Sequence, residues 1–323
     1  YGEPTPEGKK YLIDFYPHTW HDLYLAFIER SKELTGSRGY TGVLCSRSFM
    51  FLSRLGTERE FILMNADVVA LLETGVQLLD DATVRPAAVV LEWKNELSSG
   101  APSMFARLGM SDENYLVAFE QILDLNWSPR VPFLYWRDSS RFLDVPSYKW
   151  TYWASSRLLR LFGDLPSVEP TVGIARAGCS TGNDARFAHY HWEIQSTKIN
   201  SRWKSFNKGG GYSPYYMSYD LVIDWSPKAI EALSCQGNNL ASRQHYFQRA
   251  ISWPNVTEKG SSFRVQPEGM VFSNKGLVFI PHGDKQEHFW SYLAFFNSQL
   301  VDGLLLALSH ERSIDVSAVR SLP

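Results

Sequence analysis

The first third of the chain has the clearest alternation of apolar and polar positions. In residues 20–36 the apolar side chains recur at helical spacing, which predicts an amphipathic helix ended by Gly36. The positions that this spacing places on one face are Leu23, Phe27, Ile28 and Leu34.

Short apolar runs then alternate with a second helical stretch. The runs at 40–45, 68–73 and 86–93 predict strands, and residues 53–64 predict a helix. Strands and helices that alternate with short connections are typical of a doubly wound α/β sheet. These strands are too few for a complete sheet, so we expect its first half to lie upstream of Tyr1.

The pattern changes in the second half of the chain. Residues 97–114 are rich in Ser, Gly and Pro and predict a loop, and an aromatic connection follows at 127–152, between expected helices at 115–125 and 153–162. From Val172 onward short aromatic strands alternate with glycine turns, which indicates a mixed α+β domain. We therefore expect three parts, at residues 1–98, 99–167 and 168–323.

Charge separates the two halves of the chain. The 323 residues carry a net charge of −2, which gives no global signal for nucleic acid. Residues 171–280, however, hold 12 Lys and Arg against 7 Asp and Glu, while residues 1–170 hold 17 against 22. An acidic half joined to a basic half suits a catalytic domain that carries a separate nucleic-acid-reading domain, although chance asymmetry gives the same numbers.

The remaining composition favours a cytoplasmic globular protein. Its three cysteines (Cys45, Cys179 and Cys235) are far apart and odd in number, so neither a disulfide framework nor a metal site is expected. The longest apolar stretch, 289–308, contains Asn297, Gln299 and Asp302 and predicts core helices rather than a membrane span. The chain has neither a phosphate-cradling Gly-x-x-x-x-Gly-Lys-Ser/Thr loop nor a Gly-x-Ser-x-Gly elbow, which argues against a nucleotide triphosphatase and a serine hydrolase.

The segment 178–225 has the composition of a surface that contacts a charged, planar ligand. Small residues, amides, hydroxyls, cations and aromatics alternate here without a helical or strand period. Gly178, Gly182 and the triplet 209–211 allow backbone N–H groups to approach phosphate closely. We predict a DNA-binding set in this segment: Thr181, Asn183, Arg186, Lys204, Asn207, Lys208 and Tyr212.

Purely structural roles compete with these assignments. Lys204 and Lys208 also suit a solvated face, and Arg186 also suits a side chain that holds the domain's own turns together. For the three tryptophans of the segment we expect the hydrophobic core rather than base stacking: Trp192, Trp203 and Trp225.

The order of motifs in this segment resembles a known family. The run Gly178-Cys-Ser-Thr-Gly-Asn-Asp-Ala-Arg-Phe187 leads to Trp192-Glu193, then to Trp203-Lys-Ser-Phe-Asn-Lys-Gly-Gly-Gly-Tyr212 and to Ile223-Asp-Trp225. All three pieces resemble the target-recognition region of large bacterial adenine methyltransferases. These are the phage-defence enzymes of the BREX and DISARM type and the related fused type II restriction-modification enzymes.

The resemblance extends to the N-terminal part of the chain, and pieces at 246–253, 263–272, 294–298 and 321–323 resemble the family as well. Segments at 22–94 resemble the rear half of the methyltransferase catalytic domain, and 131–158 resembles the linker that follows it. Tyr1-Gly2 resembles the end of the Asn/Asp-Pro-Pro-Tyr/Phe motif, whose aromatic residue stacks on a flipped adenine. Tyr1 is therefore the candidate catalytic residue. The implied fold is the rear half of a Rossmann-like α/β domain followed by an α+β target-recognition domain.

The resemblance implies part of an S-adenosylmethionine-dependent DNA adenine-N6 methyltransferase. Its expected partners are double-stranded DNA and a missing N-terminal half or companion subunit, which would hold most of the cofactor; alone, this chain is expected to be inactive. Two alternatives remain open at this point. One is a non-catalytic DNA-binding specificity module of a defence or restriction complex, and the other is an unrelated α/β enzyme that does not bind DNA.

Overall fold

The chain folds into two compact units, Tyr1–Gly163 and Asp164–Pro323. The computed structural model describes residues 4–74, 85–94, 102–108, 117, 120, 134–235, 240–257, 259–309 and 313–323. Tyr1 and most of the expected helix at 115–125 lie outside these residues. Each unit has its own strands and buried apolar residues, so each is described by itself.

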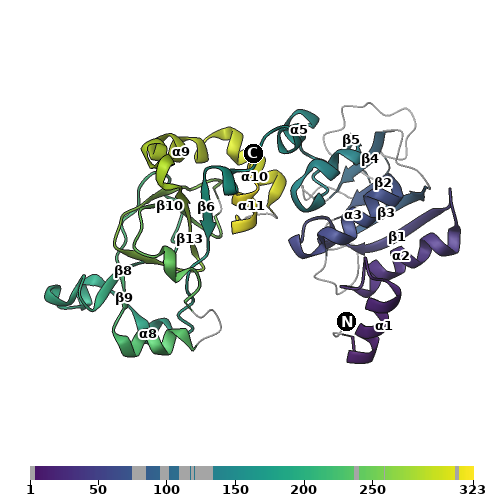
Figure 1. Cartoon of the computed structure of the whole chain (residues 1–323). Coiled ribbons are helices and arrows are strands. Elements are labelled where there is room, and N and C mark those ends of the chain that lie inside the picture. The colour runs from purple at the N-terminus through teal and green to yellow at the C-terminus, as the bar shows by residue number, and fades with distance from the viewer. Residues whose placement is uncertain are drawn as a thin grey trace. The chain divides into compact units, whose positions relative to one another are not determined.

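The first unit is built on a mixed five-stranded sheet of order β1-β3-β2-β4-β5 (Figure 1). β3 runs antiparallel to β1 and β2, β2 runs parallel to β4, and β4 runs antiparallel to β5. The strands are β1 (Tyr40–Ser46), β2 (Ala66–Glu73), β3 (Pro86–Trp93), β4 (Pro102–Arg107) and β5 (Leu134–Asp138). The α/β class is confirmed, whereas a doubly wound arrangement stays a prediction.

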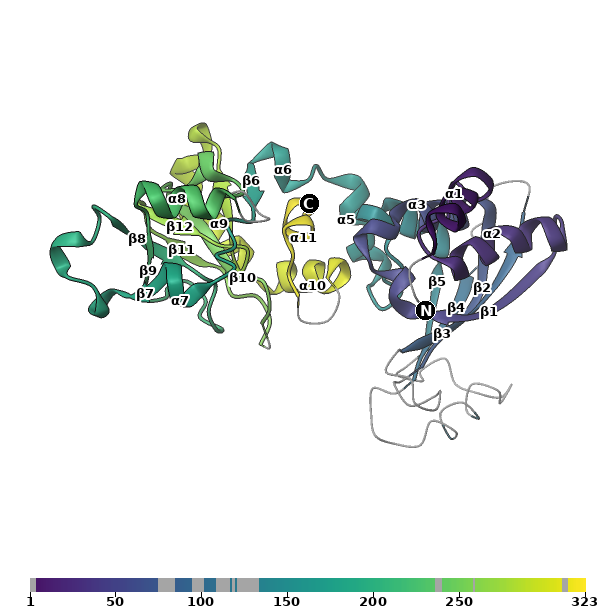
Figure 2. The ribbon, with the colours of Figure 1, turned by 90° about the horizontal axis from the view of Figure 1, so that it is seen from below.

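Helices cover one face of this sheet, with α2 against β1 and α3 against β2 (Figure 2). Thr41 on β1 faces α2, because its hydroxyl accepts from the Trp93 indole and donates to Ser31 of that helix. The helices are α1 (Pro6–Phe15), α2 (Leu23–Thr35), α3 (Gly56–Asn65) and, at the junction to the second unit, α5 (Ser156–Asp164); short 3₁₀ turns lie at Arg47–Met50, Ser53–Leu55, Ser139–Asp144 and Pro146–Tyr148.

Two expectations for this unit are wrong. The predicted loop at 97–114 contains strand β4, since Pro102–Arg107 pairs with both β2 and β5. Helix α2 forms as expected, but it buries Leu25, Ala26 and Ile28. Leu23, Phe27 and Leu34 are 54%, 64% and 72% exposed. The apolar stripe read from the sequence therefore faces away from the sheet, and only Ile28 of that stripe reaches the core.

The second unit contains two four-stranded sheets, of order β11-β10-β13-β6 and β12-β8-β9-β7. The strands of the first are β6 (Gly173–Arg176), β10 (Ala250–Pro254), β11 (Arg264–Gln266) and β13 (Gly276–Pro281). Those of the second are β7 (Ala188–Tyr190), β8 (Trp203–Asn207), β9 (Leu221–Asp224) and β12 (Met270–Phe272). The buried cluster of this unit includes Phe206, Val271 and Phe272 of the second sheet with Val278 and Ile280 of the first.

Helices of the second unit are short and lie mainly toward its C-terminus. They are α6 (Val168–Thr171), α7 (Asp184–Phe187), α8 (Pro227–Ser234), α9 (Phe289–Phe296), α10 (Gln299–Leu308) and α11 (Val316–Arg320), with 3₁₀ turns at His191–Glu193, Ser196–Lys198, Arg243–His245 and Gly283–His288. Among the described residues, no helix is by itself long and apolar enough to cross a membrane. The segments Gly283–Phe296 and Gln299–Leu308 reach that threshold only as a pair bent by 74°.

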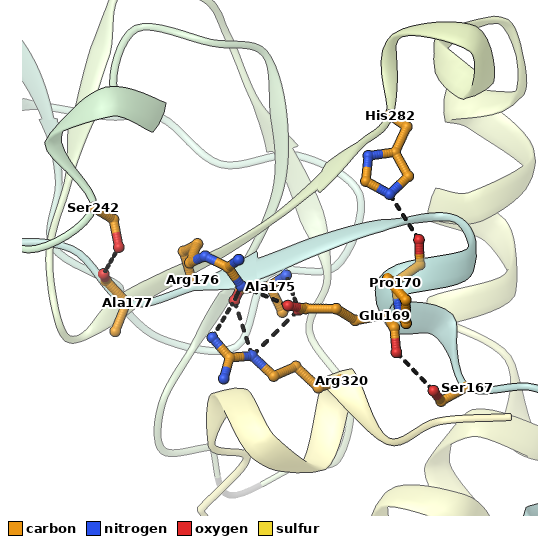
Figure 3. A network of polar contacts seen from close by, with 9 residues as sticks. All are labelled: Ser167, Glu169, Pro170, Ala175, Arg176, Ala177, Ser242, His282 and Arg320. Atoms are coloured by element: carbon orange, nitrogen blue, oxygen red, sulfur yellow. Dashed lines mark hydrogen bonds and ion pairs between the residues drawn. The ribbon is translucent and has the colours of Figure 1, made fainter.

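A network of charged groups joins the two ends of the second unit (Figure 3). The Glu169 carboxylate accepts from the Ala175 N–H and from Arg176 Nη1, each at 2.8 Å, and Arg320 Nε lies 3.2 Å from it. Arg320 also donates to the Ala175 carbonyl at 3.1 Å through Nη2. Burial acts to raise the pKa of Glu169, but the Ala175 and Arg176 hydrogen bonds and the positive charge of both arginines outweigh it and hold the pKa below its ordinary value.

Glu169→Gln tests this network. A carboxylate with a lowered pKa contributes stability above its unfolded-state pKa, near 4.3, and that contribution is lost as the pH falls through the lower folded-state value. We expect the substitution to lower the free energy of unfolding by roughly 1–3 kcal/mol at pH 7. The difference from the wild type should shrink as the pH falls below about 4. Urea unfolding midpoints of the wild type and the variant, measured at pH 7 and below about pH 4, give this difference in stability.

Glu231→Gln, at an exposed carboxylate on α8 of the same unit, is the matched control and should change the midpoint little. Equal effects of the two substitutions would show that Glu169 contributes no more than a surface charge.

Candidate nucleic-acid interface

The predicted segment lines a polar pocket in the second unit, here called the Thr181 pocket. It has a volume of about 250 Å³ and is formed where three stretches of chain meet, at 179–184, 206–208 and 273–275. Hydroxyls, an amide and two lysines line it together with one carboxylate, so it offers hydrogen-bond donors and acceptors at once.

Asp184 organises this pocket. One of its carboxylate oxygens accepts from the Thr181 hydroxyl, and the other pairs with the Lys208 ammonium. Burial lowers the pKa of Lys208, while the carboxylate beside it favours the charged form. The sequence predicted Thr181 and Lys208 as ligand contacts, and the structure brings them together on one carboxylate that was not predicted.

Asn183 and Arg186 lie at the adjacent short helix α7. Asn183 is the N-cap, and its Oδ1 accepts from the Arg186 N–H at 3.1 Å. The Arg186 side chain is exposed, with its guanidinium 4.7 Å from the centre of the Phe187 ring. Asn183 thus has a structural role as a cap, whereas Arg186 presents a cation to solvent.

Asn207 does not face solvent. Its side chain is fully buried, and its amide donates to Ser252 Oγ and to Gln266 Oε1, both at 2.7 Å. Its Oδ1 accepts from the Gly209 N–H at 3.0 Å. All these bonds are internal, so Asn207 cannot reach DNA in this structure. It instead supports the loop that follows it.

The other two predicted side chains stand nearer to solvent. Tyr212 is exposed, at the end of the glycine triplet. Lys204 is partly buried and donates to the Asn200 carbonyl. Gly178 also departs from expectation, because its N–H donates to Ser273 O and a Cβ there would lie 1.9 Å from Phe272 O. Gly178 is needed for close packing and not for phosphate.

The tryptophans divide between core and surface. Trp203 is buried and Trp225 is partly buried against the hydrophobic cluster, as expected. Trp192 is 62% exposed and stacks on Tyr190 with ring centres 4.5 Å apart, so the expectation of a core position is wrong for it. It lies in the 3₁₀ turn His191–Glu193, directly after strand β7. A stacked, exposed aromatic pair of this kind offers a face to a nucleobase.

Sequence reasoning missed the side of the pocket that comes from a distant turn. Ser273, Asn274 and Lys275 line it, and Lys275 is exposed. The signal was present, since these polar residues and Gly276 interrupt two apolar runs and therefore predict a turn. Its position beside Thr181 depends on the pairing of β12 with β8, which the sequence does not display.

Among the residues that the structure describes, no group of three or more His, Cys, Asp or Glu side chains is placed to hold a metal ion.

Comparison with known proteins finds two adenine-specific methyltransferases and a restriction-modification enzyme. No family model matches it. It is 25% identical over 97% of its length to the adenine-specific methyltransferase PglX of Lacticaseibacillus casei (strain Zhang), and 23% identical over 98% to the adenine-specific methyltransferase BrxX of Escherichia coli O9:H4 (strain HS). It spans 27% and 26% of the lengths of these two proteins.

Among solved structures, the chain is similar to the type IIL restriction-modification enzyme MmeI, which was solved in complex with DNA. The TM-score is 0.54, with 10% identity, over 95% of this chain and 42% of that one. At this identity the likeness concerns the fold alone. Taken together, nearly the whole chain is similar to about a quarter of the adenine-specific methyltransferases PglX and BrxX and shares its fold with a restriction-modification enzyme, which confirms the resemblance that its motifs predicted.

Proposed function

We propose that this chain is the DNA-recognising portion of a site-specific adenine-N6 DNA methyltransferase of a restriction-modification or phage-defence system. In this proposal residues 168–323 form the target-recognition domain, residues 1–98 the rear half of the catalytic domain, and 99–167 the connection. The similarity to PglX and BrxX supports the enzyme class, and the second unit supports the role in recognition.

The observation that carries the proposal is the Thr181 pocket with the cations around it. Lys208 and Lys275 line the pocket, and Arg186 lies on the helix beside it. Tyr190 ends β7, a strand of the sheet that also contains β8, and the exposed Trp192 stacks on it from the 3₁₀ turn that follows. Cations that reach phosphate, next to aromatic faces that stack on bases, are the two components of nucleic-acid binding.

One acid of the first unit is not free to bind S-adenosylmethionine, a cofactor with a sulfonium cation and ribose hydroxyls that acidic side chains bind. Glu73, at the carboxyl end of β2, is 2% exposed and its carboxylate is already bound by Arg47 and by the Tyr152 hydroxyl (2.5 Å). Arg107 lies 3.7 Å from the same carboxylate. Two arginines beside an occupied acid repel a cation. We therefore propose that another part of the methyltransferase holds the cofactor.

The first unit exposes the surface that such a part would cover. Thr41 faces α2, so Tyr40 and Leu44, one and three positions away on β1, lie on the opposite face of the sheet. Both are more than half exposed, and Val90 of the neighbouring strand is exposed beside them. Large exposed apolar patches mark interaction sites. The proposed occupant is the front half of the methyltransferase.

Charge-removing substitutions at the pocket test DNA binding. Lys208→Gln and Lys275→Gln should each weaken binding to a duplex uniformly across sequences, and each should reduce the salt slope of the logarithm of the affinity by about 1, because one phosphate contact is lost. Fluorescence anisotropy with a labelled duplex at several salt concentrations measures both quantities.

Lys228→Gln, at an exposed lysine on α8, is the matched control and should leave affinity and slope unchanged. A wild-type chain that fails to bind duplex DNA even at low salt would refute the proposed function.

Calorimetry tests the assignment of the cofactor. Because the acid at the carboxyl end of β2 is occupied and flanked by arginines, titration of S-adenosylmethionine into this chain should give no binding heat. Clear binding of the cofactor would contradict the proposal that another part of the protein holds it, without bearing on DNA recognition.

A further inference from the structure

A buried arginine lies beneath the glycine triplet that borders the Thr181 pocket. Arg264, at the start of β11, is fully buried. Its Nη2 donates to the Gly209 carbonyl and its Nη1 to the Gly211 carbonyl, both at 2.9 Å. One guanidinium therefore binds two carbonyls on the inner side of the same loop. The planar guanidinium, with its fixed set of N–H donors, suits such a double contact.

This arrangement fixes where the intervening N–H groups point. In a planar trans peptide the C=O and the N–H of the next residue point in opposite directions. The Gly209 and Gly211 carbonyls point inward to Arg264, so the N–H groups of Gly210 and Tyr212 point away from it. Gly210 and Tyr212 are exposed, and within the described part of the chain neither N–H has an acceptor.

The backbone of the loop is held by its neighbours. Gly209 and Gly210 have φ values of +83° and +105°, which favour glycine. A Cβ on Gly209 would lie 2.5 Å from the Lys275 carbonyl, and one on Gly210 would lie 2.9 Å from Met217 Sδ. The Gly209 N–H is fixed by Asn207. The loop is thus packed on its inner side and open on its outer side.

The charge beneath the loop favours an anion above it. Among the described residues, no carboxylate is within ion-pair distance of Arg264, and its guanidinium is bound to neutral oxygens. Burial lowers its pKa, and the Tyr219 hydroxyl beside it acts in the opposite direction. A buried cation without a partner acid is costly, and an anion on the outer side of the loop would offset part of that cost.

We propose that the N–H groups of Gly210 and Tyr212 bind a phosphodiester oxygen of the DNA backbone, and that Arg264 is the positioning residue that turns them outward. This inference rests on the proposed function, because the anion is taken to be DNA. It adds a contact made by the main chain to those of Lys208 and Lys275. Since Arg264 reaches the anion only through the loop, its effect on binding is indirect.

Amide resonances of the full chain, labelled with ¹⁵N at glycine and tyrosine, test the contact. On titration with a 16-base-pair duplex, the amide protons of Gly210 and Tyr212 should move downfield as they donate to phosphate. Gly269, another exposed glycine with positive φ, lies in a different turn and should not move. Arg264→Lys keeps the charge but not the fork, so it should weaken duplex binding about tenfold and abolish both shifts.

Arg59→Lys is the matched control. Arg59 is also fully buried and also donates to main-chain carbonyls, those of Phe49, Leu52 and Ser147, but it belongs to the first unit. Its substitution should lower stability without changing the Gly210 and Tyr212 shifts. General damage from replacing a buried arginine is thereby separated from loss of the phosphate contact.

The outcomes separate the two proposals. If the wild type binds the duplex and neither amide moves, the phosphate contact is refuted while the proposed function stands. If Arg264→Lys binds with wild-type affinity and shifts, the positioning role is refuted. Should that variant fail to fold, the wild-type shifts alone decide for or against the contact. Absence of any duplex binding refutes the proposed function and this inference with it.

Discussion

The buried amide of Asn207 is the contact on which the candidate interface depends. Asn207 ends β8 of one sheet, yet its amide donates to Ser252 on β10 and Gln266 on β11 of the other. Its remaining oxygen accepts from the Gly209 N–H and so sets the start of the glycine triplet. Gly276 permits this approach, since a Cβ there would lie 2.2 Å from Asn207 Oδ1. A polar group buried this deeply is tolerated because its partners satisfy it.

The Thr181 pocket and the glycine triplet both lie next to the end of β8, where Asn207 joins the two sheets. Because β12 pairs with β8, Lys208 and the turn at 273–275 line the same pocket, and Asp184 links Lys208 to Thr181. Arg264 then holds the far end of the glycine loop. Side chains that a ligand would touch are therefore supported by side chains that it would not touch, which is how a site keeps its geometry.

Predictions made from periodicity located α2, α3 and the first three strands of the first unit, but they gave the wrong face of α2 and missed strand β4. Helix α2 and strands β1 to β3 lie where the apolar spacing placed them. The face of α2 was wrong because the helix carries two apolar stripes, and the spacing alone does not say which one meets the sheet. Strand β4 was missed because only six residues pair there, within a segment rich in Ser, Gly and Pro.

The sequence by itself determined the resemblance to adenine methyltransferases, the basic character of the second half, and the residues Thr181, Arg186, Lys208 and Tyr212 as candidates, because motif order and composition are local properties of the chain. The tertiary structure decided which of these candidate residues lie close together in space. Asn207 and Gly178 are packed inside the second unit, and Trp192 is exposed. Lys275 and Arg264 lie at the glycine loop, although they are some 60 residues away from it in sequence. Which side chains are buried, and which distant residues come together, depends on strand pairing between distant segments, and no local sequence pattern encodes this pairing.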